Sequence, residues 1–415
     1  MHILLINQPI NNRGDESAHK ALVRTLVHKI QDLKITVLFI SEDQDTVNQF
    51  KVESECVRYV NINNHKKWWH TFFSLGLRIK CPLLWYIHPT TRELVSFYEQ
   101  CDIVLSAPGG ISMGGFQNWG HLNMLYIAKL LKKPIAYYGR SFGPFPTDTR
   151  QQRIYRDKSV SILNYFSFLS IRDKRTELLA NELGLSYIST VDTAFLETPR
   201  VVLPEEVFNI CQLRPYIIFV PNELTWHYNY KDRFTHESVL NYFSQMCEIL
   251  LAKYVDYNIL MLPQTFNYHN YKDDIIFFRE IKVIVRNERL FVLSDQYGSD
   301  VQQTIIGNAK CVVGARYHSV VFAINNAVPF VALSYEHKIE GLIESLNKQD
   351  NMIDIVNALD NEDSMRASLE MFEKKLDIAS VDLETQKIAK EKAAMSLSKF
   401  IEFVDGKNTS NSCYI

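Results

Sequence analysis

The 415-residue chain has none of the features that mark a disulfide-rich secreted protein or a membrane-spanning one. Its seven cysteines form no Cys-x-x-Cys pair, and their odd number argues against both a zinc site and a disulfide framework. No apolar run approaches the length of a membrane span, and the apolar start at residues 1–7 is too short for a secretory signal. We therefore expect a soluble, cytoplasmic protein that reaches a membrane only from its inner face.

The chain also lacks a strong charge of either sign and an internal repeat. Its formal net charge of -2 gives no general attraction to nucleic acid or to an anionic surface. No period of 20 to 50 residues is present, and no histidines have metal-ligand spacing on one predicted element. We expect no nucleic-acid partner and no bound metal.

What the chain does have is an alternation of predicted strands and helices that is typical of parallel α/β sheets. A strand at 2–6, a helix at 16–31 and a strand at 34–40 begin the first half. A Pro-containing stretch at 198–204 reads as a linker, and a strand at 216–220 starts the alternation again. The predicted parts are an N-terminal α/β domain at 1–200, a second α/β domain at 205–360, a helical segment at 361–405 and a tail at 406–415.

The segment Gly314-Ala315-Arg316-Tyr317-His318-Ser319 lies between a predicted strand and a predicted apolar helix. A Gly-containing turn at this point presents anion-binding groups at the carboxyl end of a parallel sheet. Arg316 and His318 are two residues apart, and Lys338 follows the next predicted strand. These cations suit a phosphate or a carboxylate. The alternative is a structural arginine and a capping histidine.

A second glycine-rich turn follows the predicted strand at 102–107, where residues 108–115 contain four glycines. Glycine lets backbone amides approach a ligand closely. The spacing does not match the Gly-x-Gly-x-x-Gly of dinucleotide-binding proteins. We expect Gly109 and Gly110 to form the floor of a ligand site, with a tight turn that binds nothing as the alternative.

Short motifs follow one another along residues 1–345: Asn12–Ser17, Ala107–Gly110, Tyr138–Pro144, Ser170–Asp173, Leu262–Gln264, Gly314–His318 and Ser334–Lys338. In this order they resemble the polysaccharide pyruvyltransferase family. The resemblance implies two Rossmann-like domains with parallel sheets around a central cleft, a GT-B-like fold, followed by C-terminal helices. It also implies an enzyme that makes capsule or exopolysaccharide.

The implied reaction transfers the enolpyruvyl unit of phosphoenolpyruvate onto a sugar of a polysaccharide precursor, closes a pyruvate ketal and releases phosphate. The implied acceptor is a saccharide, often lipid-linked, and no cofactor is expected besides phosphoenolpyruvate as donor substrate. Such a reaction needs cations for the donor, an acid for its methylene carbon and a base for the attacking hydroxyl.

The resemblance assigns donor binding to residues of several motifs: Arg140, Arg172, Gln264, Arg316, His318 and Lys338. His318 is the expected acid, because imidazole titrates near neutrality. A structural role is the alternative for each of these residues. For Arg172 that alternative is a salt bridge with Asp173 or Glu177, and for Lys338 it is a solvated side chain at a helix start.

The acceptor side is assigned to Asn12, Asp15 and Glu16, with Gly109 and Gly110. Asp15 is the expected base, because its loop would open on the cleft from the N-terminal domain, and Asn12 would orient a sugar hydroxyl. Carboxylates at this point also favour the start of a helix, so capping is the alternative for Asp15 and Glu16.

One departure from the family pattern concerns the donor site. Many relatives place an arginine after the first strand of the second domain, where this chain has Pro221-Asn222-Glu223. The donor site then has one cation fewer, or Arg140, Arg172 or Lys338 takes its place.

Residues 62–92 break the alternation with a mixture of aromatic and basic side chains. One interpretation is a buried helical pair. The other is an amphipathic segment at lipid headgroups, because Trp, Tyr, Lys and Arg suit that boundary. The large apolar members are Trp68, Trp69, Phe72, Phe73, Leu75, Leu77, Trp85 and Tyr86.

Two rival functions have the same fold class. A GT-B glycosyltransferase would use a nucleotide-sugar donor, since phosphate-binding turns look alike across these folds. A non-catalytic component of polysaccharide assembly would carry a decayed site. The joint presence of Arg172, Arg316, His318 and Lys338 argues against decay. A small dianion also suits the Arg-x-His turn with its later lysine better than a nucleoside diphosphate does.

Overall fold

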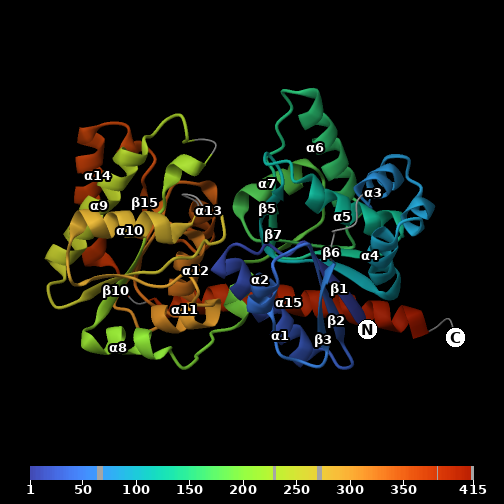
Figure 1. The fold of residues 1–415 in the computed structure, drawn as a ribbon, viewed down its shortest axis with the longest axis horizontal. Helices are drawn as coiled ribbons and strands as arrows, with labels where there is room; N and C mark the ends of the chain where they lie inside the picture. The colour runs from blue at the N-terminus through green and yellow to red at the C-terminus, as the bar shows by residue number, and fades with distance from the viewer. Residues whose placement is uncertain (63–68, 228–229, 269–272, 381, 413–415) are drawn as a thin grey trace. The chain divides into compact units, whose positions relative to one another are not determined.

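The computed structural model describes residues 1–62, 69–227, 230–268, 273–380 and 382–412, which form two α/β units (Figure 1). Unit 1 comprises Met1–Ile10, Ala18–Leu196 and Lys392–Ile415, and unit 2 comprises Asn11–Ser17 and Glu197–Glu391. The sequence interpretation placed the loop at 11–17 in the N-terminal domain, whereas its contacts group it with unit 2.

Unit 1 is built on a seven-stranded sheet in the order β3-β2-β1-β4-β6-β8-β9 (Figure 1). Leu4 of β1 pairs in parallel with Thr36 of β2 and with Val104 of β4. Strand order reverses between β1 and β4, and α/β proteins bind ligands beyond the carboxyl ends of strands at such a point. The strands are β1 (His2–Ile6), β2 (Lys34–Ile40), β3 (Val57–Ile62), β4 (Ile103–Ser106), β6 (Ile135–Tyr137), β8 (Phe168–Ile171) and β9 (Ile188–Ser189).

Side-chain caps fix where several helices of unit 1 begin. Asn118 accepts a hydrogen bond from the His121 amide at 2.9 Å, and Asp173 accepts one from the Thr176 amide at 2.9 Å. Each cap satisfies a backbone donor that a helix start leaves open. The helices are α1 (Arg13–Lys29), α2 (Gln44–Phe50), α3 (Trp69–Arg78), α4 (Pro89–Gln100), α5 (Trp119–Leu130), α6 (Arg150–Leu163) and α7 (Lys174–Glu182), with 3-10 turns η1 (Pro82–Tyr86) and η2 (Thr193–Leu196).

The glycine-rich turn at 108–115 forms a short strand, β5 (Gly109–Met113), that pairs with β7 (Arg140–Phe142). Gly143, directly after β7, has a φ of 78°, and a Cβ there would lie 2.2 Å from a Leu179 methyl. Glycine is required here by both backbone conformation and space. This small sheet lies outside the main sheet of unit 1.

The aromatic and basic segment includes α3, η1 and the start of α4, and it has a buried face and an exposed one. Contact of its exposed face with lipid stays a prediction. Trp85 is fully buried and donates its Nε1–H to the Phe73 carbonyl at 3.2 Å. A Cβ on Gly76 would lie 2.3 Å from Trp85 Nε1, so α3 and η1 are closely packed. Leu75, on the outer face, is 42% exposed. Trp68 and the side chain of Trp69 lie outside the described residues.

Unit 2 repeats the parallel architecture with a six-stranded sheet in the order β12-β11-β10-β13-β14-β15. The strands are β10 (Tyr216–Val220), β11 (Asn258–Met261), β12 (Leu290–Val292), β13 (Val312–Gly314), β14 (Phe330–Ser334) and β15 (Met352–Asp354). The helices and 3-10 turns are α8 (Glu205–Leu213), η3 (Leu224–Trp226), α9 (His236–Lys253), α10 (Asp274–Val285), α11 (Ser299–Ile306), α12 (Tyr317–Asn325), α13 (His337–Ser345), η4 (Gln349–Asn351), η5 (Asn357–Leu359) and α14 (Glu362–Ile378). The predicted α/β fold with parallel sheets is confirmed.

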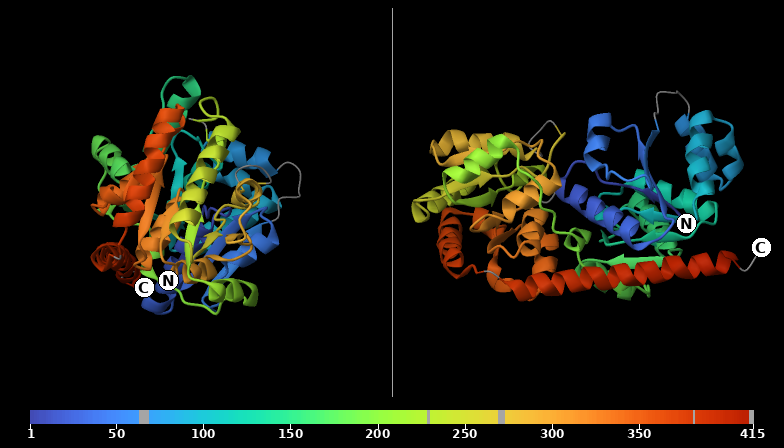
Figure 2. Two further views of the ribbon diagram at one scale, coloured as in Figure 1. Left: turned by 90° about the vertical axis from the view of Figure 1, so that its left-hand side faces the viewer. Right: turned by 90° about the horizontal axis from the view of Figure 1, so that it is seen from below.

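The last helix, α15 (Leu383–Ser412), is long and uninterrupted (Figure 2). Residues 406–412, predicted as a tail, continue this helix. Leu397, Phe400 and Val404 belong to the core of unit 1, where the Phe400 ring lies 5.2 Å from that of Phe168 and 5.4 Å from that of Tyr138. No helix among the described residues is both long and apolar enough to cross a membrane.

This packing predicts that Phe400→Ala destabilises unit 1 by about 3–5 kcal/mol, because it leaves a cavity between aromatic rings. Met395→Ala, on an exposed face of the same helix, is the control and should change stability by less than about 0.5 kcal/mol. Chemical denaturation measures both. Equal stability of the two variants would show that α15 does not complete this core.

Candidate active site

Two sequence motifs that are far apart in the chain meet in unit 2, where Gly14 packs against His318. Gly14 lies in the first turn of α1 and His318 in the first turn of α12, and the His318 side chain is buried. A Cβ on Gly14 would lie 1.7 Å from Cγ of the imidazole. Only glycine allows the backbone to approach the ring this closely.

The residues before Gly14 hold this contact by pairing with the loop after β11. The Arg13 amide donates to the Gln264 carbonyl at 2.9 Å, and Asn12 forms an antiparallel bridge with Thr265. The Asn12 side-chain oxygen accepts from the Gly14 amide at 2.7 Å. The side-chain oxygen of Asn12 is therefore bonded to the start of α1. A contact between its amide nitrogen and a sugar hydroxyl stays a prediction.

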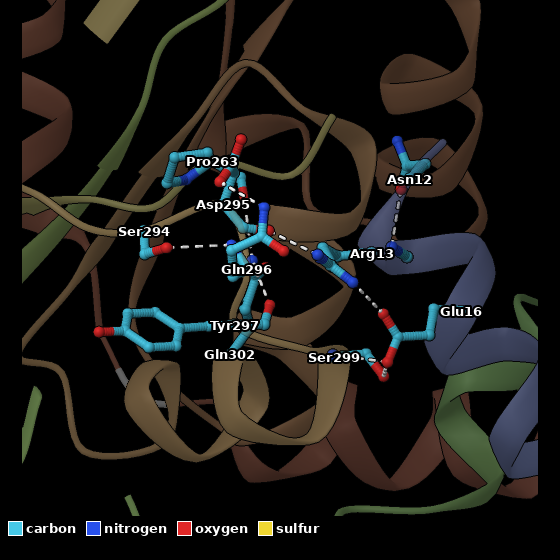
Figure 3. A network of polar contacts seen from close by, with 11 residues as sticks. Asn12, Arg13, Glu16, Pro263, Ser294, Asp295, Gln296, Tyr297, Ser299 and Gln302 are labelled. Atoms are coloured by element: carbon cyan, nitrogen blue, oxygen red, sulfur yellow. Dashed lines mark hydrogen bonds and ion pairs between the residues drawn. The ribbon is translucent and has the colours of Figure 1, made fainter. Parts of the chain in front are cut away.

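Arg13 and Glu16 form a fully buried ion pair that anchors the same turn (Figure 3). Arg13 Nη1 lies 2.8 Å from Glu16 Oε2, and the guanidinium lies 3.9 Å from the centre of the Phe266 ring. Glu16 Oε1 accepts from the backbone amide and the hydroxyl of Ser299, at 3.0 and 3.1 Å, where α11 begins. These contacts give Glu16 a structural role in place of the predicted acceptor binding, because both its oxygens are bonded and buried.

Sequence reasoning gave Arg13 no role, although the Arg-x-x-Glu spacing was visible. Such a spacing places two side chains on one face of a helix and indicates an ion pair. Nothing in the sequence showed that the pair would be buried, because its surroundings come from the loops around Phe266 and Ser299.

Arg316 precedes α12 and is held by Asp274 at the start of α10. Arg316 Nε donates to Asp274 Oδ1 at 2.9 Å, and Nη2 contacts both Oδ1 and the Thr265 hydroxyl, the latter at 3.1 Å. Burial by itself lowers the pKa of the guanidinium, but the Asp274 carboxylate outweighs burial and raises it. The Nε and Nη2 groups of Arg316 therefore face Asp274, and Nη1 is the nitrogen with no partner among the described residues.

Asp15 shares an electrostatic environment with Arg316 around Tyr268. Burial raises the pKa of the Tyr268 phenol, Asp15 raises it further, and Arg316 opposes both. Asp15 is half-buried, in contrast to Arg13 and Glu16 on either side. The structure thus brings the predicted base and two predicted donor ligands, Arg316 and His318, into unit 2.

Gln264 presents a buried side-chain amide to this site. Its backbone amide donates to Asp274 Oδ2 at 2.8 Å and its carbonyl accepts from Arg13. Its side-chain Nε2 and Oε1 are both buried and have no hydrogen-bond partner among the described residues. A buried amide without partners costs about 1–3 kcal/mol per group, so this one points to a polar ligand.

Lys338 lies at the start of α13 and is not a solvated lysine. Its Nζ lies 3.3 Å from Glu336 Oε1. Burial alone would raise the pKa of Glu336, but Lys338 and two histidines, His227 and His337, hold it below its usual value. Glu336 therefore positions the Lys338 side chain.

The segment Pro221-Asn222-Glu223 places no cation at the end of β10. Asn222 instead accepts from Trp226 Nε1 at 3.1 Å, and the Trp226 ring lies 5.6 Å from the Arg316 guanidinium. A cation over an aromatic face is stabilised electrostatically. Trp226, which follows this segment, therefore supports the Arg316 guanidinium.

The remaining predicted residues, Arg140, Arg172, Gly109 and Gly110, belong to unit 1. Arg172 forms a buried ion pair with Asp192, not with Asp173 or Glu177 as its structural alternative supposed. Arg140 Nη1 donates to the carbonyls of Asn7 and Ala107, at 3.1 and 2.7 Å. Donor binding by these two arginines stays a prediction. No cluster of three or more metal-ligating side chains occurs among the described residues.

The chain has an α/β fold with two Rossmann-like units. A putative UDP-N-acetylglucosamine 2-epimerase from Listeria monocytogenes has the same fold, with a TM-score of 0.59 and 12% identity over 97% of this chain and 96% of that one. The Neisseria meningitidis UDP-GlcNAc 2-epimerase bound to UDP-GlcNAc has a TM-score of 0.56 at 11% identity, over 96% of this chain and 100% of that one. These similarities concern the fold alone.

The sequence comparison is more specific. Residues 12–337 match the polysaccharide pyruvyl transferase family, and the chain belongs to it. It is also 21% identical over 392 residues to the amylovoran biosynthesis protein AmsJ of Erwinia amylovora, covering 87% of this chain and 89% of AmsJ. The protein is therefore a transferase of polysaccharide biosynthesis, as its motifs predicted.

The Gly14–His318 contact predicts that Gly14→Ala destabilises the protein by about 1–3 kcal/mol, because the new methyl displaces the imidazole. In a His318→Ala background the same substitution should cost much less. Gly406→Ala, with open space around it, is the control and should be neutral or slightly stabilising. A double-mutant cycle measured by denaturation tests this, and an additive cycle would contradict it.

Proposed function

We propose that this transferase uses phosphoenolpyruvate to place a pyruvate ketal on a sugar of a surface-polysaccharide precursor. The observation that carries the proposal is the packing of Gly14 on His318, because the half-buried carboxylate of Asp15 directly follows Gly14 and Arg316 lies two residues before His318. Family membership supports the reaction class, and the amylovoran relative supports an exopolysaccharide product.

The donor is a small molecule with a phosphate and a carboxylate, and unit 2 offers complementary groups. Arg316 would donate through Nη1, while Asp274 keeps the guanidinium in place. Lys338 would supply a second charge, and the Gln264 amide would supply neutral hydrogen bonds. Fixed cations stabilise charge on the donor without reorganising during reaction.

In the proposed reaction His318 protonates the methylene carbon, and C2 becomes electrophilic. A sugar hydroxyl attacks C2 as Asp15 takes its proton, and the C2–O bond to phosphate breaks. A second hydroxyl of the same sugar then closes the ketal. One of the two hydroxyl protons restores to the protein the proton that His318 gave to the new methyl group. The other leaves with phosphate, so atoms and charge balance. No cofactor takes part.

Asp15→Asn should lower turnover by about two to four orders of magnitude, the range for loss of a general base, with unchanged phosphoenolpyruvate affinity. Melting should hardly move, because Asn12 and the Arg13–Glu16 pair still hold the helix start. Asp363→Asn, in the exposed first turn of α14, is the matched control and should keep full turnover. Near-normal turnover of Asp15→Asn would exclude it as the base.

The reaction itself is tested by incubating the full-length protein with phosphoenolpyruvate and a panel of lipid-linked oligosaccharides. Mass spectrometry should detect one added pyruvate ketal, and a phosphate assay should detect equal release of phosphate. A parallel arm with UDP-sugars tests the glycosyltransferase rival. Sugar transfer from UDP-sugars without use of phosphoenolpyruvate would overturn the proposal.

We also propose that unit 1 contacts an anionic membrane through an apolar stripe, formed by Leu75 of α3, Leu83 of η1 and the residues directly after these two elements, Ile79 and Ile87. Leu83 is 75% exposed and Ile87 60%. No carboxylate occurs between Trp69 and Arg92, whereas Arg78, Lys80 and Arg92 are basic. Apolar side chains flanked by basic ones bind anionic lipid surfaces, and a lipid-linked acceptor would lie in such a surface.

The double variant Ile79→Ser, Leu83→Ser should bind phosphatidylglycerol vesicles about tenfold less tightly or worse, because two side chains no longer enter the lipid. Leu178→Ser, an exposed leucine of α7, is the control and should bind as the unchanged protein does. Vesicle co-sedimentation measures all three. Equal binding by the double variant would rule out the stripe as the contact.

A further inference from the structure

Unit 1 contains a cavity of about 490 Å³ beyond the carboxyl ends of β1 and β2. This volume falls in the range of about 300–1,000 Å³ that small-molecule sites occupy. The cavity also lies beside β1, where the strand order reverses toward β4, and such folds bind ligands at a reversal of this kind. Its polar lining residues are Asn7, Gln8, Glu42, Ser74, Ser112, Asn118, His121, Asn123 and Arg140.

The cavity offers little positive charge to an anion. Arg140 donates to two backbone carbonyls and, through Nη2, to the Ser112 hydroxyl at 2.6 Å. Burial, aided by Arg140, holds the pKa of His121 well below its usual value, so this imidazole is neutral. The ligand that fits is therefore uncharged, in contrast to the donor expected in unit 2.

Two polar side chains that line the cavity, Glu42 and Asn123, are available to bind a ligand. The Glu42 carboxylate has no hydrogen-bond or ion-pair partner among the described residues, and burial raises its pKa. The Asn123 amide, in the first turns of α5, likewise makes no hydrogen bond with the described part of the chain. A carboxylate accepts hydrogen bonds, and an amide both donates and accepts them. The two groups together are therefore suited to vicinal hydroxyls.

The rest of the wall is apolar or firmly held. Phe73 supplies buried aromatic surface, which suits the C–H face of a sugar ring. Asn7 has a φ of 62°, in the left-handed region, and is fixed by its Nδ2 bond to the His121 carbonyl at 3.1 Å and by Arg140. A residue held in this conformation at a strand end is typical of a binding site.

We propose that this cavity binds a sugar ring of the acceptor, with Glu42 and Asn123 making the hydrogen bonds that recognise its hydroxyls. This inference rests on the proposed function and names a substrate site within it. Helix α3 supports the link to a lipid-linked acceptor, because Phe73 and Ser74 line the cavity while Leu75 of the same helix, and Ile79 directly after it, belong to the apolar stripe.

Binding of methyl glycosides of galactose, glucose, mannose and N-acetylglucosamine to the full-length protein tests the proposal, with saturation-transfer NMR and calorimetry as readouts. We expect at least one glycoside to bind, and Glu42→Gln and Asn123→Ala each to weaken it by about tenfold or more. Glu53→Gln and Asn48→Ala, the same substitutions at exposed positions outside the cavity, should leave binding unchanged. Phosphoenolpyruvate affinity, titrated separately, should be equal in all variants.

Folding of the variants is checked by melting. Burial raises the pKa of Glu42, so its ionised form opposes folding above that pKa, and Glu42→Gln should melt no lower than the unchanged protein at neutral pH. Undiminished glycoside binding by both cavity variants would overturn the inference, as would a failure of every glycoside to bind. A protein that binds glycosides but not phosphoenolpyruvate would keep the cavity and refute the proposed donor.

Discussion

The candidate active site depends on the buried ion pair between Arg13 and Glu16, which fixes the first turn of α1 within unit 2. Removing one member of such a pair typically costs about 3–5 kcal/mol, because the other is left charged in a low dielectric. The pair is bonded further to Ser299 and packed on Phe266, so the turn has one position. Gly14 lies between its members, and its contact with His318 follows from that position.

The two cations of unit 2 that are expected to bind the donor are each held by a carboxylate of the same unit. Asp274 holds Arg316 and Glu336 holds Lys338. Such pairs reduce repulsion between neighbouring positive charges and fix long side chains before any ligand arrives, which is the condition for electrostatic stabilisation of a reacting dianion. Asp274 and Glu336 also weaken the attraction of the site for phosphate. The donor must therefore bind through hydrogen bonds of suitable geometry as well as through its charge.

The sequence predicted the parallel α/β fold because strand and helix periodicity is local, and the order of motifs indicated the family. The sequence did not predict the contacts between loops. Asp274 could not be identified as the partner of Arg316, since no motif contains it, and Asn12, Asp15 and Glu16 were assigned to the domain in which their helix continues. Trp226 was not predicted as a neighbour of Arg316, because the family pattern indicated only an arginine at the end of β10.

The two candidate binding regions differ in charge, and this difference bears on which substrate each would take. In unit 2, two cations are positioned by carboxylates, Arg316 by Asp274 and Lys338 by Glu336. In the unit 1 cavity, burial keeps His121 neutral and Arg140 is bonded to backbone carbonyls. A phosphate would lose its hydration in that cavity without gaining a cation, whereas a sugar would exchange water for Glu42 and Asn123 at little electrostatic cost. Desolvation alone would therefore direct an anionic donor and a neutral acceptor ring to different regions of the protein.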